Sequence, residues 1–310
     1  MPNRNLMLPP DFVATVTATY ESGAVWLRAL PALLDACAAR YGLTIGPPFD
    51  LSYNFVAPAV LADGTQVVLK LGVPHPELTT EILALERYGG DGAARLLASD
   101  PDRGILLLER LQPGTMLAAL TDDEQATEIA GTLMRRLWQP AEREHPFHTV
   151  VDWGNRGMRE LRRTFGGGAG PFPPRLVALA EAYFAEAALS DDDVLLHGDL
   201  HHENILAATR EPWLVIDPKG IVGPRGYECG TYLRNHLLNK ADPARVLARR
   251  VDQLAEILEL ERDEILRWGV AHNVLSAWWS FEARGIAAGA GLICAAFCAR
   301  ALPSTSSGGG

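Results

Sequence analysis

The spacing of apolar residues changes near residue 111 and divides the chain into two parts. In the first part, apolar positions recur at helical spacing between Ser22 and Gly42, and residues 50–72 contain two strand-like runs. These runs flank Asp63-Gly64, a pair that accepts the positive φ angles of a tight hairpin turn. A helix and two more strands are expected to follow, at residues 78–88, 94–99 and 104–111. The first part is therefore predicted to be an α+β unit.

The second part is predicted to be mostly helical. Apolar residues recur at helical spacing in four segments, which are residues 122–138, 175–189, 242–258 and 261–281. Thr121 and Asp242 are expected to cap the first and third of these helices. The apolar stretch 285–299 is shorter than the roughly 18 residues that cross a bilayer, so we expect a buried core helix there. Two strand-like segments, 194–206 and 213–220, interrupt the helices and carry polar residues at fixed offsets.

Composition and charge exclude several classes of protein. With 48% hydrophobic residues among 310, the chain can bury the core of one large domain or of two lobes and is not intrinsically disordered. The formal charge of −10 repels polyanions and attracts cations, so we expect a cationic small-molecule partner and no nucleic acid. The first apolar run is too short for a signal peptide, so we expect a cytoplasmic protein that does not associate with a membrane. Four cysteines without Cys-x-x-Cys spacing argue against a disulfide or zinc framework.

The polar residues of the two strand-like segments suit phosphoryl transfer. Asn204 follows Asp199 at the fifth position, and Asp217 follows it at the eighteenth. Transfer from a nucleotide needs a base near the acceptor hydroxyl and oxygen ligands for magnesium. An aspartate, an asparagine and a second aspartate supply these groups, because Mg²⁺ keeps several waters and needs few protein ligands. A nucleotide and Mg²⁺ are therefore expected to take part in the reaction.

These residues also resemble a known family. His197-Gly198-Asp199 with Asn204, followed by Ile216-Asp217, resembles the catalytic and metal-binding loops of the protein-kinase-like superfamily, in its small-molecule branch. The wider surroundings of these loops are most similar to the streptomycin 6-kinase branch of the aminoglycoside/hydroxyurea antibiotic-resistance kinases. The segments that carry this similarity are residues 196–206 and 216–220, Gly226-Tyr227-Glu228 and Leu233-Arg234-Asn235.

The resemblance implies a two-lobed, protein-kinase-like α+β fold. Residues 1–111 would form a small nucleotide-binding lobe with leading helices and an antiparallel sheet. Residues 112–303 would form a larger, mostly helical catalytic and substrate lobe, and residues 304–310 a disordered tail. The implied activity is transfer of the γ-phosphoryl group of ATP to a hydroxyl of an aminoglycoside, with the 6-hydroxyl of streptomycin as the first candidate acceptor.

The resemblance also implies roles for the residues that match the motifs. Asp199 would be the catalytic base, Asn204 and Asp217 would hold magnesium, and His197 would pack the catalytic loop. Lys70, at the end of an apolar strand, would pair with the α- and β-phosphates. Its carboxylate partner is expected to be Glu81, with two alternatives on the same predicted helix, Glu77 and Glu86.

The remaining nucleotide contacts are expected in the first part of the chain. The backbone of Glu109 and Leu111, at the end of the last strand, would bond adenine. The segment that should cover the phosphates has no glycine, so Ser52 and Asn54 are the candidates for phosphate contact there. Asp217-Pro218-Lys219 differs from the Asp-Phe-Gly of protein kinases, so no activation-loop switch is implied.

Substrate residues are less marked in the sequence. Carboxylates near the motifs would pair with the cationic groups of an aminoglycoside, and the candidates are Asp152, Glu203, Glu228 and Glu282. Trp153, Trp278 and Trp279 could stack on a sugar or a guanidinium group, or could belong to the core. Arg234 and Asn235 are expected to brace the catalytic segment.

Three alternatives remain open. The acceptor could be hydroxyurea or another small hydroxylated metabolite, because the fold does not fix the substrate. The alternation of His197, Asp199 and His201 would suit a zinc hydrolase if these residues lay on a strand. A non-catalytic nucleotide-binding module is a further class, which the presence of Lys70 and Asp199 opposes.

Overall fold

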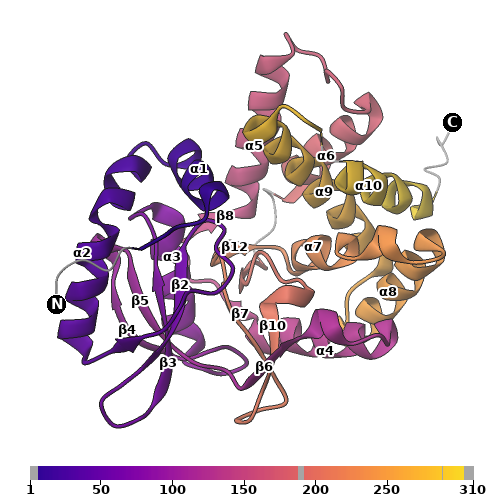
Figure 1. Ribbon diagram of the computed structural model, residues 1–310. Helices are drawn as coiled ribbons and strands as arrows, with labels where there is room; N and C mark the ends of the chain where they lie inside the picture. The colour runs from indigo at the N-terminus through magenta and orange to yellow at the C-terminus, as the bar shows by residue number, and fades with distance from the viewer. Residues whose placement is uncertain (1–5, 188–191, 288, 304–310) are drawn as a thin grey trace, which may run out of the picture. The chain divides into compact units, whose positions relative to one another are not determined.

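A computed structural model describes residues 6–187, 192–287 and 289–303 of the chain. Its internal contacts divide the chain into two compact units, Met1–Gly114 and Thr115–Gly310, which are described separately below. Figure 1 shows the N-terminal unit in indigo and purple and the C-terminal unit from magenta to yellow.

The N-terminal unit contains a five-stranded sheet in the order β1-β2-β3-β5-β4, in which all neighbouring strands are antiparallel. Its strands are β1 (Thr44–Ile45), β2 (Phe55–Val60), β3 (Gln66–Leu71), β4 (Leu96–Asp100) and β5 (Ile105–Glu109). The predicted hairpin is confirmed as β2 and β3. Gly64 in its turn has a φ of 88°, and Asp63 accepts a hydrogen bond of 2.9 Å from the backbone N–H of Thr65. The antiparallel sheet that was expected here is therefore present.

Helices pack on both faces of this sheet. They are α1 (Pro10–Thr19), α2 (Gly23–Tyr41) and α3 (Pro76–Tyr88), followed by the short helix η1 (Pro101–Arg103). Leu69 and Leu71 of β3 pack into the core formed with α1 and α2, whereas Val68 packs against the cluster that α3 forms with β5. Because side chains alternate along a strand, Lys70 lies on the α3 side.

The C-terminal unit is mostly helical, as expected, and contains two small sheets. Its helices are α4 (Asp123–Leu137), α5 (Val150–Thr164), α6 (Pro174–Ala187), α7 (Cys229–Arg234), α8 (Pro243–Leu258), α9 (Arg262–Arg284) and α10 (Gly289–Ala301), with the short helices η2 (Leu117–Ala119), η3 (His202–Asn204), η4 (Arg225–Glu228) and η5 (Leu237–Asn239). One sheet has the order β11-β10-β6 and the other β7-β9-β12-β8. The strands are β6 (Pro113–Met116), β7 (Gln139–Pro140), β8 (His148–Thr149), β9 (Val194–Leu196), β10 (Ile205–Ala208), β11 (Trp213–Val215) and β12 (Ile221–Gly223).

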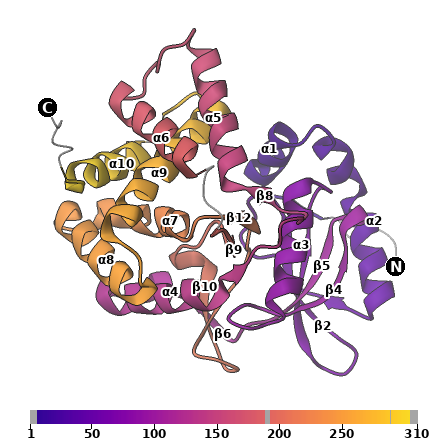
Figure 2. The ribbon, with the colours of Figure 1, turned by 180° about the vertical axis from the view of Figure 1, so that it is seen from behind.

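Helix α9 is the centre of this unit, because α5, α6, α7, α8 and α10 all contact it (Figure 2). Twelve of its 23 residues are buried, from Ile265 to Trp278. Within the part of the chain that the structure describes, no helix is both long and apolar enough to cross a membrane.

The structure corrects several details of the predicted helices. Asp122, not Thr121, caps α4, and its carboxylate accepts hydrogen bonds from the backbone N–H groups of Glu124 and Gln125. Helix α5 was not predicted. In the apolar stretch 285–299, the described helix α10 begins at Gly289, and Ile286 before it is 68% exposed. The end of the predicted helix 175–189 and the tail 304–310 lie outside the described residues.

A buried ion cluster ties three helices of the C-terminal unit together. Arg250 of α8 is fully buried, and its guanidinium donates to both carboxylate oxygens of Asp123 of α4. The same guanidinium donates to the backbone carbonyls of Tyr232, Leu233 and Asn235, at the end of α7. Burial opposes the charged form of Asp123, but the hydrogen bonds from Arg250 and Lys240 hold its pKa well below the ordinary value.

We expect Asp123→Asn to lower the free energy of unfolding by about 3–5 kcal/mol, because it leaves the buried Arg250 guanidinium without its counter-charge. Urea denaturation would measure this effect. The matched control is Asp252→Asn on α8, whose ion pair with Arg262 is exposed and should contribute at most about 1 kcal/mol. Equal stability of the two variants would contradict the importance of the buried cluster.

Candidate functional site

Two short β pairs position the candidate residues of the C-terminal unit. β9 pairs antiparallel with β12, and β10 pairs antiparallel with β11. Ile205, the first residue of β10, is opposite Val215, the last residue of β11. Asn204 directly before β10 and Asp217 shortly after β11 therefore lie at the same end of this strand pair. The backbone N–H of Ile216 donates to the carbonyl of Asn204 at 3.0 Å. The loops that carry Asn204 and Asp217 therefore meet, as the strand pattern predicted.

His197 makes three hydrogen bonds, two of which join its loop to the loop that carries Asp217. Its Nε2 donates to the carbonyl of Ile216 at 2.8 Å, and its Nδ1 accepts from the backbone N–H of Asp199 at 3.3 Å. Its own carbonyl accepts from the backbone N–H of Lys219 at 2.7 Å. The side chain is fully buried, and burial lowers its pKa to about 4. Since both ring nitrogens are engaged with the backbone, His197 is not available as a zinc ligand, which removes the zinc-hydrolase alternative.

Gly198 is required by the close approach of β12. Its φ is 82°, and a Cβ atom at this position would lie 2.6 Å from Cγ2 of Ile221. Residues with a side chain rarely adopt this backbone conformation, and this one would also collide with the strand. The glycine of the His-Gly-Asp motif therefore allows the catalytic loop to pack on β12.

Glu228 is buried and binds the backbone of the catalytic loop through its carboxylate. Its carboxylate accepts hydrogen bonds from the backbone N–H groups of His197 at 2.7 Å and Gly198 at 2.9 Å. The residue is 2% exposed, and burial raises its pKa to about 7 although these donors act in the opposite direction. The structure thus corrects the prediction that Glu228 contacts a substrate, because a carboxylate buried under a loop cannot reach one.

Asp199 lies at the turn between His197 and Asn204. The side-chain Nδ2 of Asn204 donates to the backbone carbonyl of Asp199 at 3.0 Å. Burial favours the neutral form of the Asp199 carboxyl, but the positive charge of Lys219 and the histidines His201 and His197 outweigh it, so its pKa lies below the ordinary value. A carboxylate that stays ionised can accept a proton from a nearby hydroxyl.

The donor set of these loops fits magnesium. The hydrogen bond of Asn204 uses its amide nitrogen, so its amide oxygen is the end that can bind a cation. Asp217 is exposed, and its φ of 57° places it in the left-handed region, which turns the chain after β11. One amide oxygen and one carboxylate suit Mg²⁺, which takes its other ligands from phosphates and water. No group of three or more histidine, cysteine, aspartate or glutamate residues suitable for a metal occurs within the described ranges.

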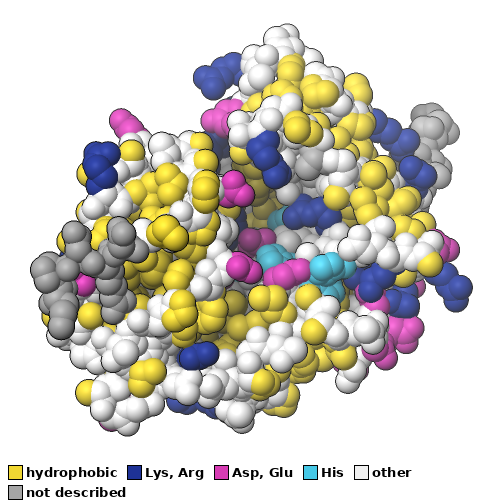
Figure 3. Space-filling model, in the orientation of Figure 1, with side chains coloured by type: hydrophobic (Ala, Val, Ile, Leu, Met, Phe, Trp, Pro, Cys, Tyr) yellow, Lys and Arg dark blue, Asp and Glu magenta, His cyan; other side chains and the backbone are white. Residues whose placement is uncertain are grey.

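The other proposed substrate carboxylates lie on three different elements, α5, η3 and α9. Asp152 is exposed in the first turn of α5. Glu203 accepts hydrogen bonds from His201 Nδ1 at 2.8 Å and His236 Nε2 at 2.6 Å, and Figure 3 shows histidine and acidic side chains next to one another at the surface. Glu282 is exposed near the end of α9, where partial burial and the nearby Glu160 carboxyl raise its pKa.

The tryptophans have different surroundings. Trp278 is 2% exposed and packs against Phe165, Phe172 and Phe281, so it belongs to the core. Trp153 of α5 and Trp279 of α9 lie edge to face, with ring centroids 5.5 Å apart.

Asn235 braces the catalytic segment, as expected, whereas the side-chain hydrogen bonds of Arg234 go to α9. Arg234 donates to Asn273 and Ser276 of α9. The side-chain oxygen of Asn235 accepts from the backbone N–H of His202. Both residues thus connect the end of α7 to the surrounding framework.

In the N-terminal unit, Lys70 forms a buried ion pair with Glu81. Its Nζ lies 2.7 Å and 2.8 Å from the two carboxylate oxygens, and the lysine is 3% exposed. Glu81 shares the buried face of α3 with Leu78, Ile82 and Leu85, at helical spacing. The alternatives Glu77 and Glu86 are exposed, so neither is the partner.

The remaining predicted nucleotide residues lie at the ends of the same sheet. Ser52 is exposed in the bend before β2. The side chain of Asn54 packs closely against Gly72, because a Cβ atom at Gly72 would lie 2.5 Å from Asn54 Oδ1. The backbone N–H of Glu109 donates to the carbonyl of Arg95, so only its carbonyl could face an adenine. Leu111 is buried just beyond β5.

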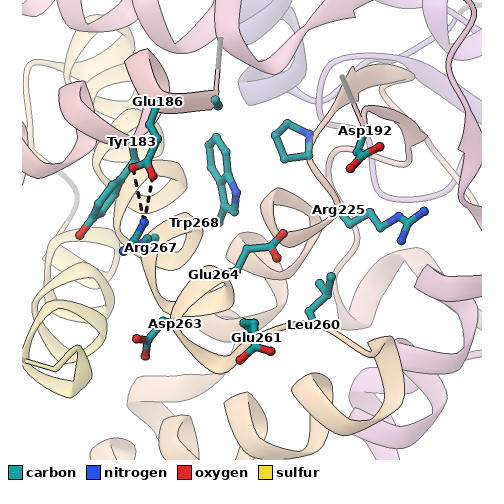
Figure 4. Close-up of a pocket in the computed structure, with 12 residues that line it drawn as sticks. Tyr183, Glu186, Asp192, Arg225, Leu260, Glu261, Asp263, Glu264, Arg267 and Trp268 are labelled. Carbon is teal, nitrogen blue, oxygen red and sulfur yellow. Dashed lines mark hydrogen bonds and ion pairs between the residues drawn. The ribbon is translucent and has the colours of Figure 1, made fainter. Parts of the chain in front are cut away.

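A pocket elsewhere in the C-terminal unit contains none of the predicted site residues. It has a volume of about 540 Å³ and lies between the end of α6 and the start of α9, where Tyr183, Arg225 and Trp268 line it (Figure 4). The ion pair between Arg267 and Glu186 spans one side of it. We therefore do not assign the chemistry of the motifs to this pocket.

Comparisons with known proteins give the same family as the motifs. The family model for aminoglycoside/hydroxyurea antibiotic resistance kinases matches residues 47–284. The chain is 34% identical over 281 residues to a streptomycin 6-kinase of Streptomyces glaucescens, which covers 89% of this chain and 91% of the relative. It is also 34% identical over 272 residues to a hydroxyurea phosphotransferase of Kitasatospora aureofaciens, covering 84% and 76% of the two chains.

The fold is shared with solved phosphotransferases. The aminoglycoside phosphotransferase APH(3'')-Id of Streptomyces rimosus, in complex with ADP and streptomycin, superposes with a TM-score of 0.55. The match covers 80% of this chain and 98% of that one, at 18% sequence identity. This likeness confirms the predicted protein-kinase-like fold.

We expect the protein to lose stability as the pH falls from 6.5 to 4.5. Burial lowers the pKa of His197 and His202 to about 4 and that of His272 to about 3, so the unfolded chain binds three protons that the folded chain does not. Glu228 acts in the opposite direction, because its raised pKa of about 7 lets the folded state bind one proton first. The net difference of two protons predicts a decrease of about 2–3 kcal/mol per pH unit in the free energy of unfolding.

Urea denaturation at several pH values would measure this slope. His272→Gln keeps a polar partner for Thr231 and removes one titrating group, so its slope should be smaller by about 1 kcal/mol per pH unit. Stability that does not change between pH 6.5 and 4.5, or an unchanged slope in the variant, would contradict this assignment.

Proposed function

The chain belongs to the aminoglycoside/hydroxyurea antibiotic resistance kinase family, and we propose that it transfers the γ-phosphoryl group of ATP to a hydroxyl of an aminoglycoside. Our first candidate acceptor is the 6-hydroxyl of streptomycin, and the product would be an inactivated antibiotic. The observation that carries this proposal is the 34% identity to a streptomycin 6-kinase over nearly the whole length of both chains.

In the proposed reaction, Asp199 receives the proton of the acceptor hydroxyl. The acceptor oxygen forms a new bond to the γ-phosphorus, the bond from this phosphorus to the bridging oxygen breaks, and ADP leaves. The loose transition state needs positioning and charge neutralisation more than a strong base. Three hydrogen bonds support this role, because they fix the backbone that carries the carboxylate. His197 Nδ1 and the Glu228 carboxylate accept from backbone N–H groups of the loop, and Asn204 donates to the carbonyl of Asp199.

We propose that the amide oxygen of Asn204 and the carboxylate of Asp217 hold magnesium. Bound Mg²⁺ would neutralise negative charge on the phosphates. The contact between the two loops at Ile216 and Asn204 supports this pairing, because it keeps both ligands at one end of the β10–β11 pair.

Residues of the N-terminal unit are proposed to bind the nucleotide. Lys70 would pair with the α- and β-phosphates, with Glu81 holding its ammonium group in place. Ser52 and Asn54 would contact phosphate oxygens. The carbonyl of Glu109 and the backbone N–H of Leu111 would bond adenine. Since ATP is the donor, we propose that the reaction takes place in the cytoplasm.

Exposed carboxylates support a cationic acceptor. Asp152 and Glu282 carry negative charge on α5 and α9, two helices in contact, and we propose that they pair with guanidinium or ammonium groups of the substrate. The partly exposed Glu203 is a third candidate, although it already binds two histidines. The overall charge of −10 would attract the same cations.

Hydroxyurea is the second candidate acceptor, because the identity to a hydroxyurea phosphotransferase is also 34%. Hydroxyurea is small and uncharged, so it would not need the exposed carboxylates. The longer coverage of the streptomycin 6-kinase favours the aminoglycoside.

An acceptor panel tests the proposed function. The purified protein with ATP and Mg²⁺ is expected to add one phosphate to streptomycin, as measured by product mass and ADP release, and to leave hydroxyurea, other aminoglycosides and simple amino alcohols unchanged. Transfer to hydroxyurea alone would replace the acceptor and keep the kinase mechanism. A lack of transfer to every acceptor would overturn the proposed function.

We expect Asp199→Ala to lower kcat by about 10²–10⁴-fold, because it removes the base, while ATP affinity stays nearly unchanged. Steady-state kinetics and ATP titration measure the two effects. The control is Asp252→Ala, which removes an exposed carboxylate on α8 and should leave kcat intact. Wild-type turnover in Asp199→Ala would refute the proposed mechanism.

A further inference from the structure

Lys219 occupies an aromatic site beside the catalytic loop. Its Nζ lies 5.7 Å from the ring centroid of Trp153 and 5.8 Å from that of Trp279. Both distances are within the range in which a cation is attracted to an aromatic face. The two rings come from different helices, α5 and α9, and meet edge to face. The ammonium group is therefore held by two large side chains that are themselves fixed by helix packing.

The backbone of Lys219 is tied to the same loop as Asp199. Its N–H donates to the carbonyl of His197 at 2.7 Å, and its Cβ lies 3.3 Å from the position that a Cβ on Gly198 would take. Lys219 also follows Asp217, one of the proposed magnesium ligands, by only two positions. The residue thus lies where the loops of Asp199 and Asp217 meet.

The charge of Lys219 acts on the groups around it. After burial, which raises the pKa of Asp199, the charge of Lys219 has the largest effect on this pKa, and it lowers it. It also lowers the pKa of the buried His272. A positive charge that acts on the proposed base lies close to the oxygen that this base would deprotonate.

The choice of lysine is unusual for this chain, which has three lysines and 25 arginines. Lys70 forms the buried pair with Glu81, and Lys240 belongs to the ion cluster of Asp123. A lysine carries a compact charge on a flexible stem, whereas arginine carries a broad planar group. A compact ammonium group can lie beside two indole rings that contact each other.

We propose that Lys219 is a charge-stabilising residue of the reaction, whose ammonium group, held by Trp153 and Trp279, faces the transferring phosphoryl group beside Asp199. This inference rests on the proposed function and adds a residue that the kinase motifs do not include. While the acceptor oxygen bonds to the γ-phosphorus and the bridging oxygen leaves with ADP, negative charge on the phosphoryl oxygens meets the ammonium. Lys219 forms and breaks no bond in this step, and the proton of the hydroxyl goes to Asp199.

Three substitutions test this role. Lys219→Met keeps the length and apolar character of the stem and removes the charge, so kcat should fall by about 10²-fold, with the KM for ATP nearly unchanged. Lys219→Arg restores the charge and should recover about tenfold of this loss. The matched control is Lys240→Met, because Arg249 and Arg250 still pair with Asp123 when Lys240 is absent.

A double-mutant cycle tests the aromatic site. Trp279 is only partly buried, so Trp279→Leu is a milder change than the loss of the buried Trp153. If the rings act by holding Lys219, Trp279→Leu lowers kcat by about tenfold in the wild-type background and has little further effect in Lys219→Met. Additive effects of the two changes would overturn the proposed action of Trp279 through Lys219.

Each variant is measured with streptomycin and also without an acceptor, where water takes the phosphoryl group and the rate of ATP hydrolysis is followed. A kcat for Lys219→Met within about threefold of the wild type, or no recovery in Lys219→Arg, overturns the inference. If the wild-type protein phosphorylates no acceptor, the proposed function fails, and the hydrolysis rates still decide the role of Lys219. Circular dichroism of every variant confirms that the fold is retained.

Discussion

The structure of the C-terminal site depends on the hydrogen bonds that fix the loop from His197 to Asn204. The Glu228 carboxylate accepts hydrogen bonds from two backbone N–H groups of this loop. The His197 side chain connects the loop to Ile216, in the segment before β12. A loop with unsatisfied backbone groups would be costly to bury, and here a buried carboxylate and a buried imidazole satisfy them. These hydrogen bonds, with the one from Asn204 to the carbonyl of Asp199, hold the backbone that carries Asp199 and Asn204.

Buried charge recurs at the places where the protein needs a fixed geometry. Lys70 pairs with Glu81, and Arg250 pairs with Asp123 and with the end of α7. Each pair takes charges out of water, which is stabilising only when the geometry satisfies both partners. Lys219 contacts two indole rings, and its positive charge lowers the pKa of Asp199. Cations held at fixed positions thus contribute to stability and, in the proposed reaction, to the chemistry.

Local sequence patterns predicted many elements because the physical signal was local. Asp63-Gly64 marks the β2–β3 hairpin, since the positive φ of Gly64 is a property of that residue alone. Helix α5 was missed because Gly154 and Gly157 lower its helical propensity. These glycines have a tertiary reason: a Cβ on Gly154 would lie 2.2 Å from the ring of Phe184, and one on Gly157 2.3 Å from Leu275. The glycines are visible in the sequence, but the residues that they approach are not.

The sequence by itself determined many of the elements, but not α5, and it determined the family and the residues of the kinase motifs. The motifs could be recognised because His197, Asp199, Asn204 and Asp217 lie near one another along the chain. The tertiary structure decided which charges meet across long separations. The structure shows that Glu228 supports the catalytic loop and is not a substrate carboxylate. It also shows that Trp153 and Trp279 contact Lys219. Burial and contact between distant segments arise only when the helices pack, so no spacing along the chain contains them.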